Sequence, residues 1–122
     1  TRKPNWVNAK VVGLTPIPEL KTMSSYPDAL YAYQIEVLES VSGSLKSGQR
    51  LLVYSQFLKD YQLIEKNILS LGQNYTFYLE ELAAVQAVDR RIATMQLLDS
   101  LDDYESPVFF ARFISNTSTS ER

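Results

Sequence analysis

The sequence predicts a mainly β domain: a small antiparallel barrel of five or six strands, with one short helix after the fourth or fifth strand. Short segments in which apolar and polar residues alternate predict the strands. Glycine, proline and serine between them predict tight turns. A chain of 122 residues suits one domain. We assign residues 1–115 to that domain and the polar residues 116–122 to a disordered tail.

The first two strands are predicted at residues 6–14 and 29–40. Apolar residues alternate with polar ones in the first, and Gly13 suits a bulge of the kind that bends a strand at a barrel corner. Prolines between the two strands predict a loop. In the second strand, residues that favour β structure occupy every other position and predict one buried face. These residues are Tyr31, Tyr33, Ile35 and Val37.

Three further strands are predicted, and a glycine-containing turn precedes the first and the last of them. Residues 49–55 are apolar on both faces, which predicts a strand that is central or covered on both sides. A weaker pattern predicts a short strand near residues 61–64, and residues 75–80 alternate clearly. Leu45 is the only apolar residue between Gly43 and Gly48, so we expect it to point inward between two turns.

The pattern changes after residue 83. Residues 84–91 are predicted to form a helix, because apolar residues recur at steps of three and four without glycine or proline. The pattern leaves residues 92–101 open between helix and strand. An acidic loop is expected at residues 102–107, and a closing strand at residues 108–114.

The composition excludes several classes of catalytic site. The chain contains no histidine and no cysteine, so it has no Ser-His-Asp triad, no thiol nucleophile and no cysteine- or histidine-bound zinc. We therefore expect no enzyme activity, no catalytic residue, no metal and no cofactor. Four acidic residues near the closing strand form either a calcium ligand set or a solvated loop, and we favour the loop. They are Asp99, Asp102, Asp103 and Glu105.

Charge and hydropathy narrow the choice of partners. The net charge is −2, which argues against a nucleic-acid partner, because such domains present a basic surface. No segment approaches the roughly 20 apolar residues that span a bilayer, so we expect no membrane span. The sequence begins at Thr1 rather than at methionine, which suggests a piece of a longer protein with any targeting signal upstream.

Aromatic residues are the candidate ligand-binding groups. The chain has eight tyrosines, five phenylalanines and one tryptophan, so tyrosine is the most frequent aromatic residue. The apolar face and polar tip of tyrosine suit both sugar stacking and protein interfaces. Several of these rings are not assigned to the core by the strand pattern, so they form either an exposed platform or part of ordinary packing. They are Trp6, Tyr54, Phe57 and Tyr61, with Asp60 or Glu65 beside them to hydrogen-bond hydroxyl groups.

Two runs of sequence resemble the netrin/metalloproteinase-inhibitor type of OB barrel. They are residues 39–53, with Gly43 and Gly48, and residues 69–79, with a Leu-Gly turn before a strand. The resemblance implies an OB-like barrel. The inhibitory activity of that family depends on an N-terminal cysteine and on disulfides, which this chain lacks, so the activity is not implied.

A longer resemblance covers about residues 10–112. The runs Val11-Val-Gly-Leu-Thr-Pro-Ile-Pro18, Tyr26-Pro-Asp-Ala-Leu30, Tyr33-Gln-Ile-Glu-Val-Leu38 and Pro107-Val-Phe-Phe-Ala111 are similar to an accessory β domain of bacterial envelope proteins. That domain accompanies SGNH-hydrolase or alginate O-acetyltransferase-like regions, whose Ser, Asp and His blocks are absent here. The resemblance implies an extracytoplasmic setting, in the periplasm or cell envelope, with acylation chemistry elsewhere in the parent chain.

Two functions follow as hypotheses. The chain is either an extracytoplasmic accessory module that binds cell-surface polysaccharide through tyrosine and tryptophan, or a protein-interaction module that docks a partner or an upstream domain through an exposed strand edge or apolar patch.

Overall fold

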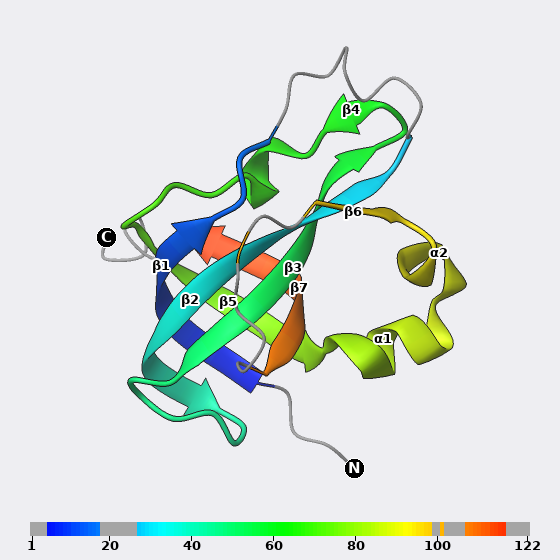
Figure 1. Ribbon diagram of the computed structural model, residues 1–122. Helices are drawn as coiled ribbons and strands as arrows, with labels where there is room; N and C mark the ends of the chain where they lie inside the picture. The colour runs from blue at the N-terminus through cyan, green and yellow to red at the C-terminus, as the bar shows by residue number, and fades with distance from the viewer. Residues whose placement is uncertain (1–4, 18–26, 99–100, 102–106, 117–122) are drawn as a thin grey trace.

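The computed structural model describes residues 5–17, 27–98, 101 and 107–116. Five strands close into a barrel in the cyclic order β1, β2, β3, β7, β5 (Figure 1). Their bounds are Asn5–Leu14 for β1, Ala29–Ser42 for β2, Arg50–Lys59 for β3, Asn74–Glu81 for β5 and Val108–Asn116 for β7. The predicted mainly β barrel with a short helix after its fourth barrel strand is confirmed.

The barrel is mixed rather than wholly antiparallel. Four of its five pairings are antiparallel, as expected. The fifth is parallel: β3 and β7 pair from Leu52 opposite Val108 to Tyr54 opposite Phe110. A parallel pair needs a long crossover connection, and here the helices between β5 and β7 form part of it.

Two short strands extend the sheet at its edges. β4, Gln62–Leu63, folds back on the end of β3, and β6, Gln96–Leu98, pairs in parallel with the start of β2. A 3-10 helix, Glu65–Asn67, follows β4. Residues 92–101 are therefore helical at their start and extended after it, while Asp99 and Ser100 lie outside the described residues.

The barrel interior is filled by the side chains that the alternation assigned to it. Tyr31, Tyr33, Ile35 and Phe77 are fully buried, and Leu45 is buried between its two turns, as predicted. Gly13 lies at an irregularity in the pairing of β1 with β2, also as predicted. Burial of these side chains is the main stabilising contribution to the fold.

A second apolar cluster lies outside the barrel wall. Helices α1, Leu82–Val88, and α2, Arg90–Ala93, lie together on one side of the barrel (Figure 1). They cover Leu52, Tyr54 and Phe110, whose side chains point away from the barrel interior. This explains why β3 is apolar on both faces: one face packs in the barrel and the other beneath the helices.

Candidate binding site

Three aromatic side chains meet on the outer face of the barrel. Trp6 of β1 lies opposite Tyr78 of β5, and Tyr78 lies opposite Phe113 of β7. The ring centroids of Trp6 and Tyr78 are 4.9 Å apart in a stacked arrangement. The centroids of Trp6 and Phe113 are 5.8 Å apart, edge to face. We call these three residues the aromatic cluster.

Strand alternation and one bulge direct these rings outward. The neighbours Val7, Phe77 and Ile114 point into the barrel, so the adjacent residue on each strand points to the outer face. In β7 the pairing with β5 shifts between Tyr78 and Leu79, which adds a residue on the β7 side. As a result Arg112 and Phe113 are both exposed to solvent.

The aromatic cluster is accessible to solvent. The Phe113 side chain is 48% exposed, and Trp6 and Tyr78 are partly exposed. Trp6 and Tyr78 stack on each other, which covers one face of each ring. Trp6 contacts both of the other rings, and such a group of surface aromatic side chains is more informative than an isolated one.

Polar groups border the aromatic cluster on one side. The Thr76 hydroxyl donates to Asn8 Oδ1 at 2.7 Å, and Asn8 Nδ2 donates to Glu39 Oε1 at 3.0 Å. This chain of hydroxyl, amide and carboxylate fixes the orientation of the Asn8 side chain. It also places both hydrogen-bond donors and acceptors next to the rings.

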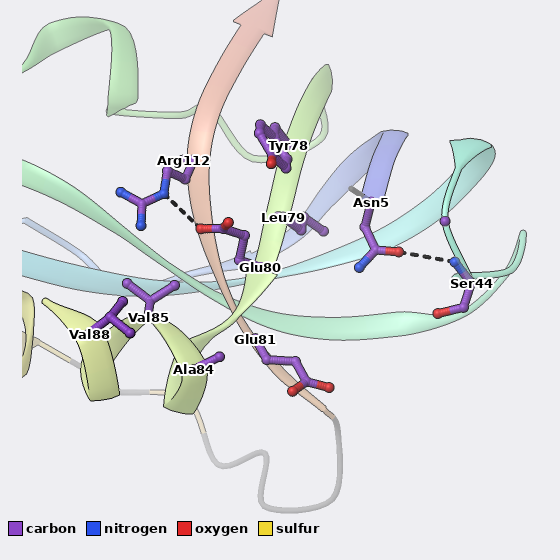
Figure 2. Close-up of a pocket in the computed structure, with 11 residues that line it drawn as sticks. Asn5, Ser44, Tyr78, Leu79, Glu80, Glu81, Ala84, Val85, Val88 and Arg112 are labelled. Atoms are coloured by element: carbon purple, nitrogen blue, oxygen red, sulfur yellow. Dashed lines mark hydrogen bonds and ion pairs between the residues drawn. The ribbon is translucent and has the colours of Figure 1, made fainter. Parts of the chain in front are cut away.

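On the side of the aromatic cluster away from these polar groups, a hollow of about 500 Å³ lies between β5 and α1. Figure 2 shows Arg112 and Glu80 on its strand wall and Ala84, Val85 and Val88 on its helix wall. Arg112 Nε donates to Glu80 Oε1 at 2.7 Å. Tyr78 also lines this hollow, so the aromatic cluster and the hollow are continuous.

The structure does not bring the sequence-predicted ligand-binding residues together. Trp6 belongs to the aromatic cluster. Tyr54 is buried beneath the helices, and Phe57 is buried inside the barrel against Tyr31, so neither ring is at the surface. Asp60 and Tyr61 form the exposed turn between β3 and β4, and Glu65 lies in the 3-10 helix.

Tyr78 and Phe113 were not predicted as site residues. The alternation of β5 did place Tyr78 on the face opposite Phe77, so that signal was present in the sequence. Phe113 follows Arg112 at a bulge, and simple alternation does not reveal that both residues face outward.

The described residues hold no group of three or more histidine, cysteine, aspartate or glutamate residues that could bind a metal ion. All four acidic residues considered for calcium lie outside the described part of the chain: Asp99, Asp102, Asp103 and Glu105. None of the helices in the described ranges is long and apolar enough to cross a membrane.

The two fully buried tyrosines of β2 are structural. Burial raises the pKa of the Tyr33 hydroxyl well above its usual range, and the hydrogen bond with Ser55 offsets part of this increase. Burial likewise raises the pKa of Tyr31, whose oxygen accepts from the Leu69 N–H at 3.0 Å and donates to the Asn67 carbonyl at 2.6 Å. Both hydroxyls stay protonated and hold neighbouring segments in place.

Comparisons with known proteins identify no family for this chain. Comparison with protein-family models, with curated proteins and with solved structures finds no match. Of the resemblance to OB-like domains, the small barrel is confirmed: the chain forms a five-stranded mixed β-barrel.

Proposed function

We propose that this chain is a non-catalytic accessory module that binds polysaccharide at the aromatic cluster. The observation that carries the proposal is the contact of Trp6, Tyr78 and Phe113 on an outer barrel face. Aromatic rings offer apolar faces to the C–H groups of sugar rings, and the indole and phenol add a polar tip. The extracytoplasmic setting rests only on the resemblance to envelope accessory domains.

The polar border of the aromatic cluster supports a sugar rather than a purely apolar ligand. Asn8, Thr76 and Glu39 present amide, hydroxyl and carboxylate groups next to the rings. Sugar hydroxyls act as both donors and acceptors, so they match this mixture. A polymer suits an open face better than a monosaccharide, because each sugar contributes only a few contacts and several are needed for useful affinity.

The test uses the only tryptophan in the chain. The single tryptophan is Trp6, so its fluorescence reports directly on the aromatic cluster. We expect a saturable change when neutral or acidic oligosaccharides are titrated. Phe113→Ala leaves the probe in place and is expected to weaken binding about tenfold, the effect of losing one well-packed aromatic contact.

A matched control separates the aromatic cluster from any other exposed ring. Tyr61 is 55% exposed and lies away from the cluster, at the turn between β3 and β4. Tyr61→Ala should therefore leave the affinity for the sugar unchanged. Equal effects of Phe113→Ala and Tyr61→Ala, or no saturable signal with any member of a glycan array, would exclude the proposal.

A second candidate function is docking of a partner domain. It is favoured by Val88, which is 80% exposed on α1 beside Ala84 and Val85 at the hollow. Under this alternative the chain binds no sugar, and a partner domain that it retains in a pull-down is lost on Val88→Asp. Sugar binding that is unaffected by Val88→Asp would instead favour the first function.

A further inference from the structure

A second hollow, of about 230 Å³, lies on the other side of Arg112. It opens between the end of β3, the start of α2 and the middle of β7. Its lining is mainly polar, with a smaller apolar part from Ile92, Met95 and Phe110. Lys59, Arg91 and Arg112 bring positive charge to it from three separate elements. We call it the basic hollow.

The basic hollow is lined mainly by positive charges, although the whole chain has a net charge of −2. The whole sequence has 12 basic and 14 acidic residues, yet three basic residues and one acidic residue, Asp89, line this hollow. In the described part of the chain Arg112 pairs with Glu80, and Asp89 also lines the hollow, but neither Lys59 nor Arg91 forms an ion pair. The hollow therefore keeps an excess of positive charge that a bound anion would balance.

Contacts within the fold position both Arg112 and Asp89, and those of Arg112 leave several of its donors available. Arg112 uses Nε for Glu80, and its guanidinium carbon lies 5.7 Å from the centre of the Phe110 ring. A guanidinium carries five N–H donors, so four remain after the bond from Nε. The Asp89 carboxylate accepts from the backbone N–H of Arg91 at 3.0 Å and of Ile92 at 3.4 Å, which fixes the start of α2.

We propose that the basic hollow binds an oxyanion, that is, a carboxylate, sulfate or phosphate group. Two arginines and a lysine supply charge-assisted donors of the type that binds such groups. This site is separate from the aromatic cluster, and the proposal does not depend on sugar binding there.

The oxyanion has two possible sources, which share this chemistry: a free ion, or the acidic group of a larger ligand such as a uronate sugar. Two titrations of the full chain distinguish them, one with inorganic phosphate and one with a uronate trisaccharide. Binding is followed by NMR through the backbone amides of Arg91 and Ile92. Saturation by phosphate alone identifies a free-ion site, and saturation only by the trisaccharide identifies the acidic group of a sugar.

Arg91→Gln and Lys59→Gln are each expected to weaken binding about tenfold or more, and the affinity of the native chain should fall as salt is added. Arg50→Gln is the matched control, because Arg50 is an exposed arginine that pairs with Glu36 outside this hollow. Lys59→Gln does not touch the Asp89 cap, so it remains informative if Arg91→Gln disturbs α2. Circular dichroism and Tm confirm that each variant is folded.

The proposal is overturned if neither probe gives saturable shifts, or if Arg50→Gln weakens binding as much as Arg91→Gln. The titration of Trp6 fluorescence with neutral oligosaccharides should be the same in Arg91→Gln and in the native chain. Failure at the basic hollow and failure at the aromatic cluster are therefore seen in different measurements.

Discussion

The hydroxyl oxygens of Tyr33 and Ser55 lie 2.6 Å apart inside the barrel, where neither side chain is exposed to solvent. The two residues come from β2 and β3, which pair as antiparallel neighbours in the barrel. Each hydroxyl satisfies the other in a mainly apolar interior. Removing one of them leaves the other buried without its partner.

Tyr33→Phe is therefore expected to lower the free energy of unfolding by about 1–3 kcal/mol, measured by urea denaturation. The double variant Tyr33→Phe/Ser55→Ala should recover part of this loss, because it leaves no unpaired hydroxyl. If the double variant is destabilised by the sum of the two single changes, the two hydroxyls are not coupled.

Stability should fall at alkaline pH because of the buried tyrosines. Burial raises the pKa of Tyr31 and Tyr33 in the folded state, while in the unfolded chain they ionise near their ordinary value of about 10. Their contribution is fully present below that pH and is lost as pH rises toward the folded pKa values. Above about pH 10 the loss is about 1.4 kcal/mol per pH unit for each tyrosine.

The measurement is urea denaturation between pH 8 and pH 11. Tyr31→Phe and Tyr33→Phe should each reduce the slope above pH 10, and the double variant should reduce it further. A slope that both changes leave untouched would assign the alkaline instability to other groups.

The turn between β3 and β4 has backbone strain that glycine should relieve. Asp60 and Tyr61 have φ values of 50° and 66°, and they connect the paired residues Lys59 and Gln62. A two-residue turn of this kind favours glycine at its second position. Tyr61→Gly is expected to raise stability by about 0.5–1 kcal/mol in urea denaturation. Tyr61→Ala keeps the Cβ atom and should give no such gain; an equal gain from alanine would argue against strain.

Gly43 and Gly48 are a matched pair for testing whether the close contact between Gly43 and Asn5 requires glycine. Both have positive φ values, 99° and 86°. A Cβ atom at Gly43 would overlap Asn5 Oδ1 and lie 2.9 Å from Asn5 Cα, whereas one at Gly48 would meet nothing within 4 Å. Gly43→Ala should therefore be the more destabilising change, by about 1 kcal/mol or more, as measured by thermal denaturation. Equal losses at the two positions would mean that the contact with Asn5 relaxes without cost.

Most of the barrel could be predicted from local patterns in the sequence. Alternation identified the barrel strands, because burial on one face repeats every second residue. The third strand continues to Lys59, beyond the predicted end at Ser55, because the buried Phe57 and Leu58 extend it. The helix begins at Leu82 and ends at Val88 rather than at Arg91, because Asp89 adopts an extended backbone and caps α2.

Contacts between distant segments could not be predicted in the same way. β6 exists because Gln96–Leu98 pairs with Ala29–Tyr31, and no local pattern specifies that partner. The aromatic cluster depends on the registers of two strand pairs and on the bulge at Arg112. The sequence singled out Trp6, but only the register shows that Tyr78 and Phe113 are its neighbours.

The aromatic cluster joins the first strand of the barrel to the last. Trp6 and Phe113 come from β1 and β7, so their contact exists only once the closing strand has docked between β3 and β5. A ligand that needs both rings therefore binds only the fully closed barrel. By mass action such a ligand stabilises the whole fold and protects amides throughout the core from exchange, not merely those beneath it.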